Sequence, residues 1–449
     1  MSSPIDILPV EVFEYVVADL CMNDIVLLMR ISKAYHTFLE PLLWTRIEMH
    51  RIGFHAQNIH NRLRGEEVRT RQDPPYDPGP DWDGVETDLD VTAHGRAERF
   101  LKTFSTHEKW GKGLSEGRRS YLGSLVRWLC LPVNLGLPYE HPADVDPWNS
   151  FANFVNLEYL EISGFWVPPS TSAPFLAPDH GLAKLRTLKL RGYFPKEFVQ
   201  WLLKEPANIK QLQLGIMDAP VGSSNVGPHD WINPPPPENR RPANMEGMSG
   251  EEIAEWEGVE DLEQESVAPR ALACLTPDIM SRLTNLKALY LCKPANGDQL
   301  DDDLIYFSEP SDKRILEEWN ALLRATRKTL VYIILDQRPI AHENVSDGSS
   351  NRAYMRRCAN GPSYKRFVEM VLPALLESKE CPNLKFIRFF GFECDDEVMD
   401  VLYGDPDYPG ESVDVPNQIQ AAFPHVEVTT RAGRRMIIWD DSGEILSGK

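Results

Sequence analysis

The sequence contains 449 residues, of which 42% are hydrophobic and 25% are charged, and its formal net charge is −20. One hydrophobic core stops growing at roughly 250–300 residues, so this length predicts two modules or one elongated repeat array, and the composition excludes wholesale disorder. The acidic balance argues against a nucleic acid or an anionic membrane as the main partner, because both need a dense basic face.

The sequence also lacks the segments that would place the protein in or across a membrane. It has no uncharged apolar run of about 18 residues. The first eight residues do not resemble a secretory signal, because no basic region precedes an apolar one. The seven cysteines include no Cys-x-x-Cys pair, which favours reduced, packed thiols. We therefore expect an intracellular protein, located in the cytoplasm, the nucleus or both.

Three apolar stripes at helical spacing follow one another in the first 45 residues. Pro9 suits the first turn of a helix, where its missing N–H is not needed, and Ser32 is a candidate N-cap for the third helix. The stripes are Val12, Val16 and Leu20, then Ile25, Leu28 and Ile31, then Tyr35, Phe38 and Leu39. Three helices this short form a poor core and leave apolar side chains exposed, which indicates an interaction surface.

The order of residues in this segment resembles an F-box: Leu8-Pro9, an aliphatic helix, Asp24-Ile25, Ile31-Ser32, and finally Leu43-Trp44. The resemblance implies that residues 1–50 dock on a Skp-type adaptor and, through it, on a cullin–RING ubiquitin ligase. The residues implied to contact the adaptor are Leu8, Pro9, Val12, Val16, Leu20, Ile25, Leu28, Ile31, Ser32, Tyr35, Leu43 and Trp44. The alternative is a three-helix cap on the downstream domain that has no outside partner.

Two segments concentrate the negative charge. Residues 72–95 contain seven acids and residues 242–269 contain nine, and neither segment has a Lys or an Arg. Both are irregular, and the first is rich in proline while the second follows the run Pro234 to Pro237. Each therefore buries too little apolar surface to offset the entropy of ordering it. We expect residues 51–119 to be a linker that is disordered over about 66–92, with a helix near 93–105, and we expect an acidic insertion at about 219–268.

An aliphatic-x-x-aliphatic-x-aliphatic spacing recurs eight times from residue 126 onward. The copies begin at Val126, Leu157, Leu185, Ile209, Leu286, Leu330, Leu384 and Phe423, and three of them share an Asn-Leu lead-in, with Asn156, Asn285 and Asn383. Each copy predicts a short parallel strand followed by a return segment, so residues 120–440 are expected to stack as an α/β solenoid. This part is similar to irregular leucine-rich-repeat regions attached to F-boxes, especially in fungi. The alternative is an ordinary α/β domain whose buried strands share this spacing.

No motif for catalysis, phosphate binding or metal binding is present in the sequence. We therefore expect no enzymatic activity, no metal and no cofactor. The F-box resemblance implies a substrate-recognition subunit of a Skp–cullin–F-box ubiquitin ligase, whose repeat domain binds an unidentified protein substrate. The alternative is a non-catalytic interaction scaffold that has no ubiquitination role. Aromatic residues that follow the strands and are expected to be exposed are the candidate substrate contacts, and the alternative is that they pack in the core: Phe165, Trp166, Tyr193, Phe194, Phe390 and Phe392.

Overall fold

The structure is a computed structural model that describes just under half of the chain. The described residues are 17, 20, 22–49, 96–97, 99–105, 114–133, 148–164, 175–218, 270–292, 309–337, 362–377, 381–390, 392 and 415–431. The predictions for residues 1–16, 66–92 and 219–268 lie outside them. Within the segment 93–105, for which a helix is predicted, residues 96–97 and 99–104 are helical.

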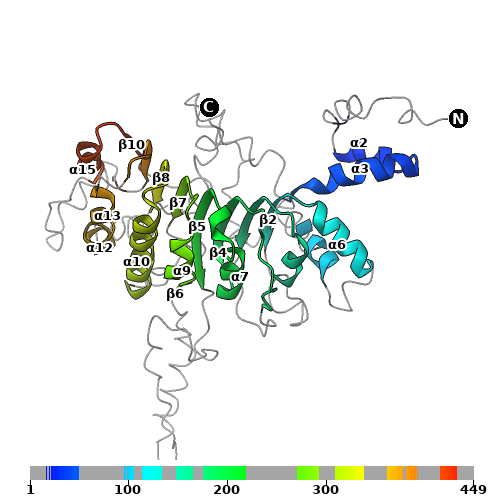
Figure 1. Ribbon diagram of the computed structural model, residues 1–449, viewed down its shortest axis with the longest axis horizontal. Helices are drawn as coiled ribbons and strands as arrows, with labels where there is room; N and C mark the ends of the chain where they lie inside the picture. Colours follow the sequence, from blue (N-terminus) through cyan, green and yellow to red (C-terminus); the bar gives the residue numbers. More distant parts are fainter. Residues whose placement is uncertain are drawn as a thin grey trace, which may run out of the picture.

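One sheet of nine parallel strands organises the described residues, and this places the protein in the α/β class (Figure 1). The strands lie in chain order, each next to the one before it: β1 Arg46–Glu48, β2 Trp128–Val133, β3 Tyr159–Gly164, β4 Thr187–Tyr193, β5 Gln211–Asp218, β7 Ala288–Cys292, β8 Tyr332–Asp336, β9 Phe386–Phe390 and β10 Glu427–Arg431. A tenth strand, β6 (Arg270–Ala271), pairs antiparallel with β5.

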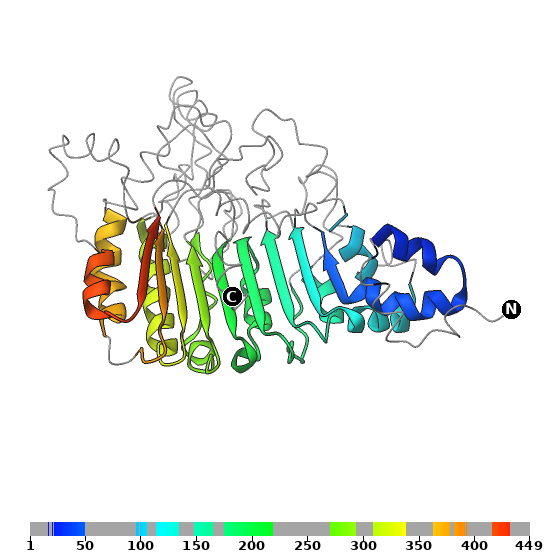
Figure 2. The ribbon, with the colours of Figure 1, turned by 90° about the horizontal axis from the view of Figure 1, so that it is seen from above.

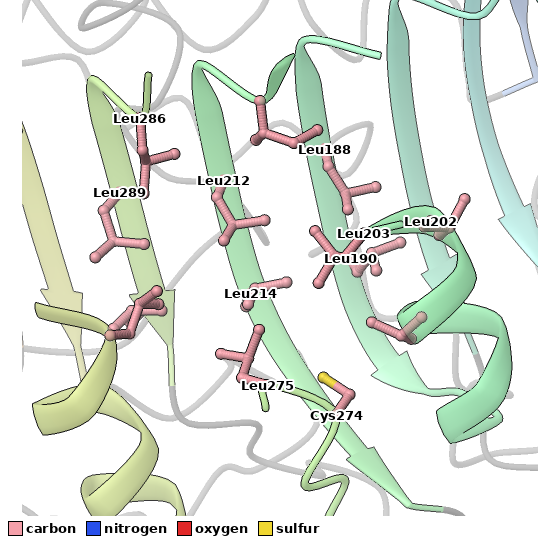
Figure 3. Packing of buried hydrophobic residues seen from close by; sticks show 14 of the residues in the cluster. Leu188, Leu190, Leu202, Leu203, Leu212, Leu214, Cys274, Leu275, Leu286 and Leu289 are labelled. Carbon is pink, nitrogen blue, oxygen red and sulfur yellow. The ribbon is translucent and has the colours of Figure 1, made fainter. Parts of the chain in front are cut away.

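The repeated aliphatic spacing explains the strands. Seven copies coincide with strands, from β2 to β5 and from β7 to β9, whereas the eighth overlaps β10 only at Val428, which pairs with Ile387 of β9. The last two aliphatic residues of a copy are two positions apart, so both point to the same face of the sheet. Leu188 and Leu190 of β4 lie beside Leu212 and Leu214 of β5, and all four are buried (Figure 3).

The helices that connect the strands pack on this aliphatic face of the sheet (Figure 2). All of them except η3 (Pro206–Asn208) contribute large apolar side chains to the same core; for example, Phe198, Leu316 and Phe367 are fully buried there. These segments are α6 Glu116–Leu125, η2 Trp148–Asn153, α7 Lys196–Leu202, η3 Pro206–Asn208, α9 Pro277–Ser281, α10 Glu309–Thr326, α12 Pro362–Met370, α13 Leu372–Leu376 and α15 Val415–Ala422. The core therefore extends along the whole sheet.

Asparagine side chains tie the segments before four of the strands to the segments before the neighbouring strands. Four asparagine amides donate to backbone carbonyls: Asn156 to Ser124, Asn208 to Ala183, Asn285 to Ala207 and Asn383 to Lys328, at 2.6–2.8 Å. A side-chain amide that satisfies a turn carbonyl removes the need for water there. The shared asparagine before the repeat thus has a structural role, and Asn208 extends it to a copy that begins with isoleucine.

Glu318 on α10 provides a test of the packing of that helix. Its side chain is only 14% exposed, and burial raises its pKa to about 7, opposed in part by Arg314. The folded state therefore holds a proton that the unfolded state releases above pH 4.5, so this group lowers stability progressively as the pH rises from about 4.5 to about 7.

We expect Glu318→Gln to raise the free energy of unfolding by about 2–3 kcal/mol at pH 8 and by well under 1 kcal/mol at pH 4. Urea denaturation at the two pH values measures the difference. Glu317→Gln is the matched control, because the neighbouring carboxylate is 41% exposed. Equal effects of the two substitutions at pH 8 would contradict the assignment.

Candidate functional site

A small helical head precedes the sheet. It contains α2 (Met22–Met29) and α3 (Lys33–Thr45). The head has a small core of its own, formed by Val17, Ile25, Tyr35 and Leu39. Ser32 is the N-cap of α3, as the sequence predicts: its extended backbone (φ −154°, ψ 160°) lets Oγ accept a hydrogen bond from the Tyr35 N–H at 3.1 Å.

The head exposes apolar side chains that its core does not use. Leu27 is 58% exposed and Ile31 is 67% exposed. Leu27 lies on α2, and Ile31 lies in the turn between α2 and α3. Leu42 of α3 is a third exposed aliphatic side chain, at 37%. Exposed aliphatic residues gathered on so small a unit are typical of an interaction surface.

The structure divides the residues implied to contact an adaptor. Leu8, Pro9, Val12 and Val16 lie outside the described residues. Ile25 and Tyr35 are buried in the core of the head, Leu20, Leu28, Leu43 and Trp44 are partly buried, and Ile31 is exposed. Leu27 and Leu42 were missed by the sequence prediction. Leu27 itself was a usable signal, because it is a large aliphatic residue that lies outside the predicted stripe of Ile25, Leu28 and Ile31.

Two contacts fasten the head to the rest of the molecule. The buried carboxylate of Glu40 on α3 accepts hydrogen bonds from both terminal nitrogens of Arg118 on α6, one of them at 2.8 Å. This hydrogen bonding raises the pKa of Arg118. Trp44 packs against Phe100 and Phe104, with ring centroids 6.1 and 5.8 Å apart. The chain then enters β1, which pairs with β2.

The face of the sheet opposite the leucines carries polar residues at matching positions. One row crosses all nine strands: Glu48, Cys130, Glu161, Lys189, Gln213, Tyr290, Ile334, Arg388 and Thr429. Within it, Lys189 Nζ lies 3.3 Å from Glu161 Oε2, and the two side chains are 6% and 1% exposed. The Tyr159 hydroxyl donates to the same carboxylate, so a buried charged network joins β3 and β4.

The environment of this network is unfavourable for nucleophilic chemistry. Burial raises the pKa of the Cys130 thiol, and Glu161 and Glu48 raise it further. Burial and Glu161 also raise the pKa of Tyr159. Both groups therefore stay protonated, whereas a nucleophilic thiol must be a thiolate. The Tyr290 hydroxyl donates to Asp336 Oδ2 at 2.7 Å, and both residues are buried.

A neighbouring row on the same face is partly accessible and aromatic. Trp128 stacks on Tyr159 with ring centroids 4.6 Å apart, and Tyr332 stacks on Phe386 at 5.1 Å. All four side chains are partly buried, and the Arg46 guanidinium lies 4.4 Å from the Trp128 ring centroid. These aromatic residues occupy the position just before the second aliphatic residue of their repeats, which is the signal that could have identified them.

The sequence-based candidates for exposed substrate contacts require correction. Phe194, Phe390 and Phe392 are buried. Phe194 packs against Trp148 at 5.6 Å and Phe392 against Phe367 at 4.7 Å, because the chain turns back toward the helices after these strands. Phe165, Trp166 and the side chain of Tyr193 lie outside the described residues. The prediction of exposure is therefore wrong for the three phenylalanines.

The described residues also bear on other classes of site. Within that part of the chain, no group of three or more His, Cys, Asp and Glu side chains is arranged to hold a metal ion. The same residues include no helix that is both long and apolar enough to cross a membrane. Comparison with models of protein families and with curated proteins gives no match to this chain.

The buried pair between β3 and β4 predicts a large effect on stability. Lys189→Met should lower the free energy of unfolding by about 3 kcal/mol, because the buried Glu161 carboxylate loses its ammonium partner. The double variant Glu161→Gln/Lys189→Met should recover much of this loss. Denaturant unfolding at pH 7.5 measures both, with the exposed Lys184→Met as the control. A loss no greater than that of the control would contradict the pairing.

Proposed function

We propose that this protein is a substrate-recognition subunit of a Skp–cullin–F-box ubiquitin ligase. The observation that carries the proposal is the helical head. Its residues follow the order of an F-box, its own core is small, and Leu27, Ile31 and Leu42 remain exposed. In this proposal the head binds a Skp-type adaptor, the part that contains the sheet binds a protein substrate, and no residue of the chain performs covalent chemistry.

The exposed aliphatic residues supply the physical basis for adaptor binding. Burying a large aliphatic side chain in an interface contributes through the hydrophobic effect, at about 25 cal/mol per Å² of apolar surface removed from water. Interfaces concentrate their energy in a few such central anchors. Leu27 and Ile31 suit this role because neither contributes to the core of the head, so they are available without unfolding it.

The attachment of the head supports a receptor that acts by proximity. Such a receptor accelerates transfer by raising the effective concentration of a substrate lysine near the activated ubiquitin. A loose tether would spread that substrate over a large volume. Here Glu40–Arg118, Trp44 and the β1–β2 pairing connect the adaptor-binding head to the sheet through ordered contacts.

The second candidate function is a non-catalytic interaction scaffold that has no ubiquitination role. The attachment of the head to the sheet also favours the scaffold function. Ile25 and Tyr35 are buried in the core of the head, and β1 forms the first strand of the sheet. In that case α2 and α3 act as a cap for the first strand. The two functions differ in one measurable property, which is whether the exposed aliphatic residues bind an adaptor.

We expect the full chain to bind a purified Skp-type adaptor, and Leu27→Asp/Ile31→Asp to weaken binding by at least about 30-fold, as loss of a central anchor does. Isothermal titration calorimetry measures the affinity. Leu176→Asp is the matched control, because Leu176 is 74% exposed and lies outside the head, and circular dichroism should show that all three chains melt alike.

Two outcomes would reject the receptor proposal. Absence of adaptor binding by the wild type leaves the scaffold function. Binding that survives Leu27→Asp/Ile31→Asp would show that the adaptor recognises another surface, and the assignment of the head would be wrong. A reconstituted ligase then tests the remaining step, since a receptor must promote ubiquitin transfer to the substrate that it binds.

A further inference from the structure

A line of cations marks the edge of the sheet where the strands begin. The residues directly before β2, β4, β5, β7 and β9 are Arg127, Arg186, Lys210, Lys287 and Lys385, and all five are exposed. We name them the basic edge. The residue before β3 is Glu158, whose Oε1 lies 3.9 Å from Nη1 of Arg127. The residue before β8 is Val331. The line therefore contains one acid.

Backbone hydrogen bonds hold these residues in register. The carbonyls of Arg127, Arg186, Lys210 and Lys287 each accept hydrogen bonds from two successive N–H groups at the start of the neighbouring strand. Arg186, for example, accepts from Lys210 and Gln211 at 2.7 and 3.1 Å, whereas Lys385 accepts from Glu427 alone at 2.8 Å. Because the same pattern recurs from strand to strand, the cations stand at equivalent positions. Adjacent strands are about 4.8 Å apart, so the span from Arg186 on β4 to Lys385 on β9 is about 19 Å.

The positive charge of the basic edge is not neutralised within the described residues. Arg186, Lys210, Lys287 and Lys385 make no ion pair there, whereas Arg282, Arg324 and Arg366 each contact a carboxylate. Like charges placed at neighbouring positions repel one another, and the chain as a whole is acidic, with a net charge of −20. Four cations that have no ion pair among the described residues and that are aligned along one edge therefore need an explanation beyond general solubility.

We propose that the basic edge is a docking site for an acidic segment of a partner polypeptide. An extended chain rises about 3.3 Å per residue, so about six residues would cover the 19 Å from Arg186 to Lys385. Aspartate and glutamate side chains of that segment pair with the lysines and arginines, which steers the approach of the partner and fixes its direction across the strands. The proposal does not depend on the adaptor-binding function.

A polypeptide fits this edge better than a nucleic acid does. The line is a single file of side chains, whereas binding to a nucleic acid requires a broad basic face to neutralise many phosphates. The overall charge of −20 would repel a polyanion at longer range. A short acidic segment brings only a few charges, and its neighbours can be neutral.

Fluorescence anisotropy of the full chain with a labelled eight-residue peptide that contains five glutamates tests the proposal. We expect saturable binding at 50 mM NaCl that weakens at 200 mM, and no binding of the peptide with glutamine in place of glutamate. Lys210→Gln/Lys287→Gln should weaken binding about fivefold, as loss of two exposed pairs does. Lys313→Gln/Lys365→Gln, which removes two exposed lysines from α10 and α12, should change it less than twofold.

Three outcomes would overturn the proposal. Equal weakening by both lysine pairs would show general attraction without a site. Tighter binding of a single-stranded oligonucleotide than of the peptide would assign the edge to nucleic acid. Peptide binding that becomes at least tenfold tighter when residues 242–269 are deleted would show that the acidic segment of this chain is the occupant. Failure of adaptor binding in the separate calorimetry experiment leaves each of these results unchanged.

Discussion

The register of the parallel strands is the constraint on which the rest of the structure depends. Each repeat has two aliphatic side chains on one face of its strand, and these are buried only because the neighbouring strands present theirs at the same height. A slip of one residue would turn a strand's aliphatic residues to the other face. The same register stacks the turns, so it also places the asparagine bonds and the basic edge.

Much of the sheet could be predicted from the sequence, because its apolar spacing repeats locally. A pattern such as Leu185, Leu188 and Leu190 contains both the turn residue and the strand, so eight strands were identified from short windows. β1 was missed because Arg46–Glu48 contains only Ile47 of that pattern. Its pairing with β2 involves residues about 80 positions away, and no local pattern reports that distance.

The polar face was beyond prediction for a related reason. Glu161 and Lys189 are 28 positions apart, and only the register of β3 and β4 shows that they form a buried pair. Phenylalanines that the structure buries were predicted to be exposed, because a phenylalanine after a strand is equally compatible with solvent and with the core. Phe194 and Phe392 pack against the helices, whereas Trp128 and Tyr332, within the repeats, remain partly accessible.

The two proposed surfaces meet different physical requirements. The head has aliphatic side chains that favour a partner through burial, which depends little on salt, whereas the basic edge attracts through charges that salt screens within about 8–10 Å. Because α3 leads directly into β1, the head is attached at the first strand and the basic edge extends away from it across the sheet. A partner bound along that edge is therefore held at a distance from the head that the sheet itself sets, and a flexible tether would not provide such a fixed separation.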